Sequence, residues 1–341
     1  MASILTYLSR IAAAAALLAS ALPAAAETKL LMSTFFPPTH PIVADVLMPW
    51  AKEVGTATQG RVTIEMSSAS LAPPPGQLDM VQKGIADVAL QYAGVVPNRL
   101  LPELMTEMPG TTGSAAAMSK ALWATHERYF AKDDRYKGLH LLGLIVFPAQ
   151  EFFCVKACPT TIDQMKGMKV ATTPSTPAKQ YGALTSGVVA GPAVRYFEVV
   201  SKGIVDAYAS ITPLDVISFN LAPATTGILK MKDLGTAGSF ALVVNPKKWA
   251  EISEADRKTI TALGGTAFAA RMGAMDEAIN SALKRLSDGG VKTVQASPQL
   301  NADLKKAYEF LSEEWVKEVG KRGIDGTAAL TFYRERVATD K

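Results

Sequence analysis

The side chains best able to do chemistry in this sequence are two cysteines and three histidines. Cys154 and Cys158 lie four positions apart, whereas His40, His126 and His140 are scattered along the chain. A nucleophilic dyad could be built from Cys154 and His140, but any chain with a few such residues offers a pair of this kind. No third ligand lies near the cysteines to complete a metal site. We therefore predict no catalytic site, no metal and no cofactor.

The two cysteines could instead form a disulfide bond in an oxidising compartment. In an extended strand, positions four apart are separated by roughly 13 Å, whereas a disulfide requires Cα atoms within about 7 Å of each other. The pair can close only if the chain turns at residues 157–159. The spacing is therefore compatible with either a disulfide bond or two free thiols.

The composition and the missing motifs favour a binding protein over an enzyme. The chain has no Walker loop and no GxGxxG, GxSxG, HExxH or CxxC motif. Its formal net charge of +4 is spread along the chain, whereas nucleic-acid and membrane-surface binding require clustered Lys and Arg. With 48% hydrophobic and 19% charged residues, the chain has the balance of a packed globular protein.

The first 26 residues have the pattern of a secretory signal peptide. Arg10 precedes an unbroken apolar run over residues 11–22, and three small residues at 24–26 precede Glu27. The run is shorter than the roughly 20 residues that a transmembrane helix needs, and no cysteine near the predicted cleavage site could carry a lipid. We expect cleavage at or near Glu27, export to the periplasm and a soluble monomer of about 315 residues that is not inserted in the membrane.

The mature chain contains two regions in which predicted strands and helices alternate. The strands are expected at residues 29–35, 60–66, 84–90, 139–147, 152–155, 168–172, 187–190, 204–209 and 239–244, and the helices around 42–54, 78–82, 113–134, 178–185 and 194–201. Pro49 should kink or shorten the first helix. A β-α-β-α-β order is typical of a doubly wound α/β unit, so two such regions predict two α/β lobes.

A long helix is expected to cross both lobes. The segment Ser253-Glu-Ala-Asp256 has the spacing of a helix start, and apolar residues keep helical spacing almost to Asp288. A helix of about 35 residues would be about 52 Å long, which exceeds one lobe, and Gly264-Gly265 is the place where it could bend. A last amphipathic helix carries Leu304, Tyr308, Leu311, Trp315 and Val319 on one face.

Several different short motifs lie along the chain in the same order as in one known protein family. They are His40-Pro41, Gly60-Arg-Val, Gly76-Gln-Leu78, Val81-Gln-Lys-Gly-Ile-Ala-Asp87, Asp163-Gln-Met-Lys-Gly-Met-Lys-Val170, Gly203-Ile-Val-Asp206 and Val244-Asn-Pro-Lys-Lys-Trp249. In this order they resemble the solute-binding proteins of tripartite ATP-independent periplasmic (TRAP) transporters. The resemblance implies a two-lobed periplasmic binding protein with a hinged cleft and a long helix spanning both lobes. It also implies closure over one small organic acid and delivery to membrane permease subunits.

The expected lobes are discontinuous in sequence. Lobe I is expected to comprise residues 27–147 with about 236–270, and lobe II residues 148–235 with about 271–330. The ligands of such proteins lie between the lobes, beside the carboxyl ends of the strands.

The arginine that the resemblance leads one to expect is missing. The family usually has an Arg where this chain has Ala171, and that Arg holds a ligand carboxylate by two parallel hydrogen bonds. The family's Gly-Gln-Glu-Asn is changed to the segment 207–210, Ala-Tyr-Ala-Ser, and Gln150-Glu151 lies where some members have a second Arg. A standard dicarboxylate such as succinate is therefore not expected, and a less charged, amphoteric or aromatic ligand is favoured.

The candidate ligand-binding residues follow predicted strands or begin helices near the cleft. They are Phe35, Phe36, Gln91, Tyr92, Gln150, Glu151, Thr172, Arg195 and Ser210. Arg195 begins a helix, where a cation is locally unfavourable, so it is either a substitute for the missing Arg or a solvent-exposed residue.

Two functions are compatible with the resemblance. The first is capture of a small organic acid or related polar metabolite for a TRAP permease. The second is a periplasmic ligand-sensing subunit for a signalling partner. A periplasmic hydrolase would need a nucleophile and a base that the sequence does not provide.

Overall fold

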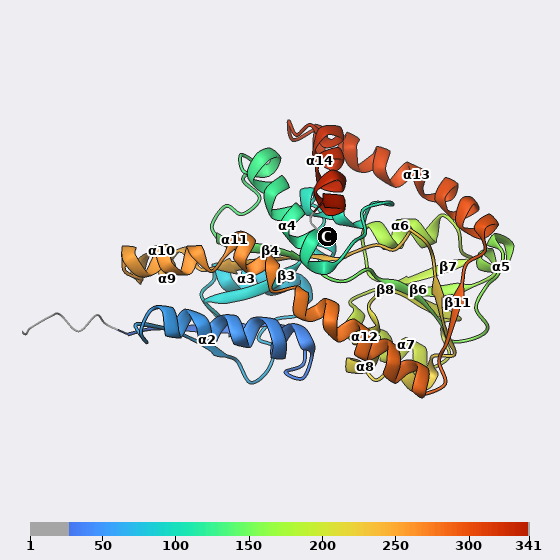
Figure 1. Cartoon of the computed structure of the whole chain (residues 1–341), viewed down its shortest axis with the longest axis horizontal. Coiled ribbons are helices and arrows are strands. Elements are labelled where there is room, and N and C mark those ends of the chain that lie inside the picture. Colours follow the sequence, from blue (N-terminus) through green and yellow to red (C-terminus); the bar gives the residue numbers. More distant parts are fainter. Residues whose placement is uncertain (1–26, 340–341) are drawn as a thin grey trace, which may run out of the picture.

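Apolar runs at the predicted positions build a first sheet of five strands, in the order β2-β1-β3-β10-β4 (Figure 1). The computed structural model describes residues 27–339. The strands are β1 (Thr28–Ser33), β2 (Val62–Met66), β3 (Val88–Tyr92), β4 (His140–Val146) and β10 (Ser239–Val244). The pairs of β1 with β2 and with β3 are parallel, and β10 is antiparallel to both β3 and β4. Every residue of β3 and β10 is buried, as expected for central strands with continuous apolar sequences.

A second sheet has six strands, in the order β11-β9-β5-β8-β6-β7. Its strands are β5 (Glu151–Cys154), β6 (Lys169–Thr172), β7 (Gly187–Ala190), β8 (Ala207–Ile211), β9 (Gly227–Lys230) and β11 (Lys292–Gln295). Strand β6 is parallel to β7 and β8, whereas β5 is antiparallel to β8 and β9. The parallel pair of β9 and β11 at the edge was not expected from the sequence.

Each sheet has its own helices, so the predicted two-lobed α/β fold is confirmed (Figure 1). We call the unit around the first sheet lobe I and the unit around the second sheet lobe II. The helical segments of lobe I are η1 (Ile42–Leu47), α2 (Met48–Ala57), η2 (Pro74–Gly76), α3 (Gln77–Gln82), η3 (Ala93–Val95), η4 (Pro102–Glu107), α4 (Ala115–Thr125), η5 (His126–Phe130) and α9 (Pro246–Glu251). Those of lobe II are α5 (Ile162–Lys166), α6 (Thr176–Gly182), η6 (Ala193–Arg195), α7 (Tyr196–Ser201), α8 (Pro213–Ser218) and η7 (Ala222–Ala224).

Pro49 divides the first helix of lobe I into two parts. A π-helical turn, η1, ends at Leu47, and Pro49 lies in the first turn of the α-helix α2. The first turn tolerates proline because its N–H groups have no partner within the helix.

Two crossover segments connect the lobes and run side by side. The Phe147 N–H donates to Gly238 O at 2.9 Å, and the Gln150 N–H donates to Thr236 O at 2.7 Å. Strands of residues 28–146 and 239–244 form the first sheet, and strands of residues 151–230 and 292–295 form the second. This membership supports the proposed lobes, residues 27–147 with about 236–270 and residues 148–235 with about 271–330, and makes the crossover pair the candidate hinge.

The helical segment after Ser253 crosses from one lobe to the other in three pieces. These are α10 (Glu254–Ala262), α11 (Gly265–Ala270) and α12 (Gly273–Asp288). The helix is interrupted at Gly264-Gly265, where the bend was expected. A Cβ on Gly264 would overlap the carbonyl oxygen of Leu142 in β4, so glycine is required at this close approach. A second break at residues 271–272 was not expected. Helix α12 packs on α4 and η1 of lobe I and on α8 of lobe II. Figure 1 shows its orange ribbon beside α8.

The C-terminal helices also contact both lobes. Helix α13 (Pro298–Gly320) packs on α5 and α6 of lobe II and on η4 of lobe I, whereas α14 (Gly326–Thr339) packs on α4. The face of α13 predicted to be apolar is buried. None of the helices within residues 27–339 is long and apolar enough to cross a membrane. The predicted signal peptide, residues 1–26, lies outside the described residues.

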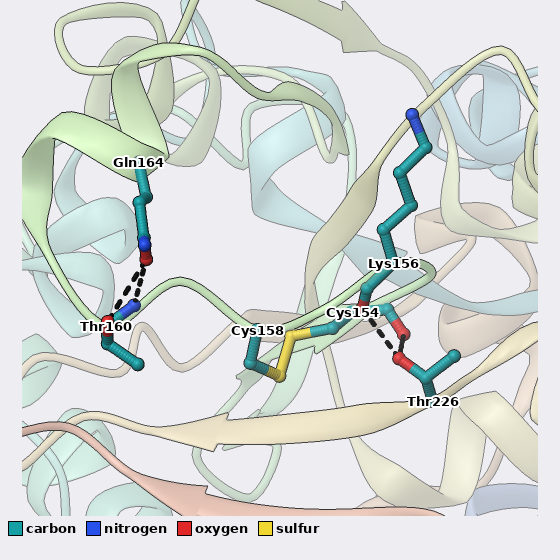
Figure 2. Close-up of a disulfide and its surroundings, with 6 residues drawn as sticks. All are labelled: Cys154, Lys156, Cys158, Thr160, Gln164 and Thr226. Atoms are coloured by element: carbon teal, nitrogen blue, oxygen red, sulfur yellow. Dashed lines mark hydrogen bonds between the residues drawn. A yellow bond between two sulfur atoms is a disulfide. The ribbon is translucent and has the colours of Figure 1, made fainter.

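Cys154 and Cys158 form a disulfide bond at the end of β5 (Figure 2). The chain turns after β5 and brings the two Cα atoms to 5.3 Å. The Thr226 hydroxyl donates to Lys156 O at 2.6 Å and supports this turn. A Cβ on Gly227 would lie 2.8 Å from Cys158 Sγ, so glycine is required beside the bridge. Because Cys154 is oxidised, it offers no thiol nucleophile to a dyad with His140.

Candidate ligand-binding site

A small cavity lies between the two lobes. Lobe I contributes Phe35, Phe36, Pro74, Tyr92, Val95, Phe147 and Phe240, and lobe II contributes Gln150, Thr173, Pro192, Ala193, Val194, Ser210, Ile211, Asp215 and Phe219. The cavity volume, counted as the space that the centre of a water molecule can occupy, is about 40 Å³. One water needs about 10–15 Å³ by this measure, so the cavity has room for only a few water molecules.

Five aromatic rings of lobe I form one wall of the cavity. They follow or end β1, β3 and β4 or lie near the start of the antiparallel strand β10, so all of them meet at one edge of the sheet. The ring centroids of Phe147 and Phe240 are 4.2 Å apart, and those of Tyr92 and Phe240 are 5.2 Å apart. Phe36 stacks on Phe35 at 4.6 Å and on Phe147 at 5.5 Å. Phe219 of lobe II faces this wall, and the resulting apolar surface suits a planar ring.

Two glycines fix the position of the Tyr92 ring. A Cβ on Gly94 would overlap the Tyr92 hydroxyl and lie 2.8 Å from Cε1, and a Cβ on Gly238 would lie 3.0 Å from Cε2. The Tyr92 hydroxyl donates to Glu107 Oε1 at 2.8 Å and lies 3.3 Å from Thr173 Oγ1 of lobe II. Burial raises the pKa of Tyr92 well above its usual value, so this group is a phenol rather than a phenolate.

A buried hydrogen bond between His40 and Asp215 joins the lobes beside the cavity. His40 Nδ1 accepts the Ile42 N–H at 3.1 Å, so the ring proton is assigned to Nε2, which donates to Asp215 Oδ1 at 3.2 Å. Asp215 Oδ2 accepts the N–H and the hydroxyl of Thr212, both at 2.7 Å, in the capping box of α8. Three donors therefore stabilise the Asp215 carboxylate.

The remaining polar groups of the cavity are neutral. Ser210 has a φ of 65°, a left-handed conformation that is uncommon for residues other than glycine, and its hydroxyl lies 2.7 Å from Thr172 Oγ1. Gln150 Oε1 accepts the Thr236 hydroxyl at 2.6 Å, which leaves its amide N–H groups free to meet a ligand. Among the described residues, no Lys, Arg or His lines the cavity.

The structure brings five of the nine predicted ligand-binding residues to this cavity. Phe35, Phe36, Tyr92, Gln150 and Ser210 are lining residues. Their contact with a ligand stays a prediction.

Gln91 points away from the cavity. Successive residues of a strand point to opposite faces, so Gln91 and Tyr92 cannot both face the cleft. The Gln91 amide donates to Pro74 O at 3.0 Å, and its Oε1 accepts the Leu78 N–H at 3.2 Å. Gln91 thereby holds the proline-rich loop, which places Pro74 in the cavity wall.

The other three predicted residues also lie outside the lining. Thr172 hydrogen bonds to Ser210 and supports it. Glu151 forms an ion pair with Lys230, and burial raises the pKa of the Glu151 carboxyl while Lys230 opposes that shift. Arg195, at the end of η6, is exposed.

Several lining residues were not among the candidates, and some had a detectable signal. Phe147 is the last residue of the predicted strand 139–147, and Phe240 lies near the start of the run SFALVV, so the position at a strand end could have indicated both. Asp215 and Phe219 carried no such signal, because they approach the cleft only through the closure of lobe II.

Ala171 is buried, and aromatic rings occupy its surroundings. It has no exposed surface and belongs to an apolar cluster with Phe153, Tyr196 and Tyr208. The Tyr196 hydroxyl donates to Ala209 O at 3.1 Å, which fixes that ring. The space that a long cationic side chain would need is therefore filled.

Known proteins share both the sequence and the fold. Residues 32–318 match the model of a family described as bacterial extracellular solute-binding protein, family 7. The outer membrane transporter protein TsaT of Comamonas testosteroni is 31% identical over 329 residues, which cover 96% of this chain and 97% of that protein.

Two crystal structures of TRAP solute-binding proteins superimpose closely on this chain. A protein from Bordetella bronchiseptica, with bound (R)- and (S)-mandelate, has a TM-score of 0.88 and 28% identity, covering 92% of this chain and 99% of that chain. A marine metagenome protein, specific for aromatic acid ligands and bound to 3-hydroxybenzoate, has a TM-score of 0.85 and 23% identity, covering 92% of this chain and 98% of that chain. The two-lobed fold, the cavity between the lobes and the match over residues 32–318 agree, and the chain belongs to family 7 of the bacterial extracellular solute-binding proteins, as a TRAP solute-binding protein.

Proposed function

We propose that this protein binds a small aromatic carboxylate between its lobes and delivers it to the permease of a TRAP transporter. The observation that carries the proposal is the cavity itself, which six aromatic rings line and to which no basic side chain within residues 27–339 contributes. Stacking on such rings recognises a planar ligand, whereas a short aliphatic dicarboxylate would leave two anionic groups without a cation. The mandelate bound by the Bordetella bronchiseptica protein is a ligand of the proposed class.

Neutral donors would hold the ligand carboxylate in place of an arginine. The free amide N–H groups of Gln150 and the hydroxyls of Ser210 and Thr173 lie on the lobe II side of the cavity. Hydrogen bonds to a charged group contribute about 1.5–3 kcal/mol each. We infer that these groups orient the carboxylate while the rings of lobe I hold the aromatic part.

A ligand panel tests this function. Mandelate, benzoate and 3-hydroxybenzoate should each raise the melting temperature of the purified mature protein, because a ligand well above its Kd stabilises by several kcal/mol. Succinate should not. Stabilisation by succinate and none by the aromatic acids would contradict the proposal.

A pair of phenylalanine variants locates the binding site. Phe219 lines the cavity and is half-buried, so Phe219→Ala should weaken binding of the best aromatic acid by about tenfold through lost apolar contact. Phe197 is 46% exposed on α7 and does not line the cavity, so Phe197→Ala is the matched control and should bind like the wild type in calorimetry. An equal loss of affinity in both variants would mean that the ligand does not bind in this cavity.

Arg195 should not contribute to binding. Its side chain is exposed and lies outside the cavity lining, so Arg195→Ala should change the Kd of the same acid by less than about twofold. Calorimetry at low ionic strength is the sharpest test, because salt screens distant charges. A loss of affinity of about tenfold or more would indicate that Arg195 is the substitute for the missing arginine.

Export is part of the proposed function. We infer that the signal peptide, residues 1–26, is removed and that the mature protein acts in the periplasm beside its permease, as the pattern of Arg10, an apolar run and small residues supports. Mass spectrometry of exported protein should give an N-terminus at or near Glu27. An N-terminus at Met1, or a mass that includes a lipid, would contradict this.

A further inference from the structure

Glu107 is a buried carboxyl group directly behind the cavity wall. It ends η4 and has no exposed surface. Its Oε1 accepts the hydroxyl of Tyr92, whereas its Oε2 has no hydrogen-bond partner. No basic side chain of the described residues forms an ion pair with Glu107, and the Thr176 hydroxyl of lobe II also interacts with the Glu107 carboxyl group. An unpaired buried carboxylate would be costly, so this position favours the protonated acid.

The elements packed against η4 supply no charge that would stabilise an anionic Glu107. Strand β10 and segment η3 carry no titratable side chain. Lys179 of α6 is ion-paired with Glu314 of α13 at the surface. Tyr181 of α6 and Tyr308 of α13 are buried phenols whose pKa values burial raises.

The other charged groups near η4 are also engaged elsewhere or exposed. Glu103, one helical turn before Glu107, is paired with Arg135. Lys120 of α4 is half-buried, and the charged side chains of α13 are exposed or half-buried. Burial raises the pKa of Glu107 to about 7, and the interactions with the hydroxyls of Tyr92 and Thr176 oppose that shift.

An anionic ligand would bring a second negative charge into this cavity. Asp215 of lobe II already contributes one carboxylate, and no cation lines the space among the described residues. Charge must be compensated when the closed lobes exclude water, because a buried unpaired charge costs several kcal/mol. Tyr92 connects the cavity to Glu107, a group that can change its charge, since the Tyr92 hydroxyl donates to Glu107 and the Tyr92 ring lines the cavity.

We propose that Glu107 and Tyr92 form a hydrogen-bond relay, coupled to the uptake of one proton, that takes the place of the missing arginine. When an aromatic carboxylate binds above neutral pH, Glu107 takes up one proton from the solvent, and its carboxylic O–H donates to Tyr92 Oη. The Tyr92 O–H then turns and donates to the ligand carboxylate. No covalent bond of the ligand changes, and the proton returns to the solvent when the lobes open and the ligand leaves.

The relay rests on the proposed function and predicts a direction for the pH dependence. A nearby ligand anion raises the pKa of Glu107 further above 7, so the complex holds a proton that the free protein has lost above about pH 7. Binding is therefore strongest at and below neutral pH. As the pH rises above 7, the Kd should increase about tenfold per pH unit, the slope for one proton.

Calorimetry counts the proton directly. Mandelate or benzoate is titrated into the mature protein at about pH 7.5 in two buffers with different ionisation enthalpies, and the difference in apparent enthalpy gives the number of protons taken up. We expect about one for the wild type and none for Glu107→Gln, whose Kd should no longer depend on pH. Tyr92→Phe should bind about tenfold more weakly and lose most of the uptake, because the ligand no longer contacts the relay. Glu313→Gln, an exposed acid on α13, is the control and should keep the wild-type uptake.

Infrared spectroscopy of the ligand-free protein gives a second readout. Below neutral pH the wild type should show the carbonyl band of a protonated carboxylic acid that Glu107→Gln lacks. Binding without proton uptake, or an unchanged pH slope in Glu107→Gln, would overturn the relay and leave the proposed function intact. Failure of every aromatic acid to bind would overturn the proposed function and the relay with it.

Discussion

Replacing Gly94 with alanine should abolish tight binding of the aromatic acid while the protein still folds. The new Cβ would overlap the Tyr92 hydroxyl and approach its ring to 2.8 Å. The ring cannot simply step aside, because Gly238 and Phe240 confine its other side. Overpacking of this kind costs about 1–3 kcal/mol of stability, and the displaced hydroxyl loses its contacts with both Glu107 and the cavity. We expect affinity to fall by about a hundredfold.

Gly191→Ala is the matched control for this substitution. Gly191 lies in the loop beside the cavity, and a Cβ there would meet no atom within 4 Å. It should fold and bind like the wild type in parallel denaturation and calorimetry. If Gly94→Ala binds as tightly as Gly191→Ala, the Tyr92 ring is not positioned as the structure has it, and its role at the site is refuted.

Restoring the family's arginine at Ala171 should destabilise the protein strongly. Ala171 has no exposed surface and packs among Phe153, Tyr196 and Tyr208, so the guanidinium would be buried without a carboxylate partner. Such a charge costs about 3–5 kcal/mol. Denaturant unfolding should show this loss, and the variant should bind neither the aromatic acid more tightly nor succinate.

The same substitution at Ala183 serves as the control. Ala183 is exposed at the end of α6, where a cation is favourable to the helix, so Ala183→Arg should leave stability within about 0.5 kcal/mol of the wild type. A stable Ala171→Arg protein that binds the aromatic acid more tightly would mean that the ligand is an ordinary carboxylate for an arginine clamp. The account of the missing arginine would then fail.

The sequence predicted the central strands well because their burial leaves a clear pattern. The run SFALVV coincides with the fully buried strand β10. The predicted strand at residues 187–190 coincides with β7, which lies at the edge of its sheet and was indicated by its apolar run instead. Strands β9 and β11 escaped prediction because GILK and KTVQ are short segments, and their pairing joins residues far apart in the chain. No local pattern records such a contact.

The long helix shows where periodicity alone is insufficient. Apolar spacing runs through residues 254–288, yet the chain breaks twice. The first break could be predicted from Gly264-Gly265. The second, at Arg271-Met272, is followed directly by Gly273, a signal that the apolar spacing hid, and it lies where the segment leaves lobe I for lobe II.

The site was only partly predictable because its two walls come from different lobes. The ends of the predicted strands indicated that Phe36 and Tyr92 line the cavity. Because successive residues of a strand point to opposite faces, Gln91 could have been excluded from the lining once Tyr92 was included. Nothing in the sequence indicated that Glu107 is buried, since an acidic residue among the apolar residues of a short helix is normally expected at the surface. Its burial depends on α6 and α13 closing over η4, which only the tertiary structure reveals.

A crystal structure of the mature protein with mandelate tests the central claim most directly. The account predicts one mandelate between the lobes, with its ring among Phe36, Phe147 and Phe219 and its carboxylate within hydrogen-bond distance of Tyr92 Oη and the Gln150 amide. No arginine should contact it. A carboxylate held by Arg195, or a ligand bound outside this cavity, would contradict the account.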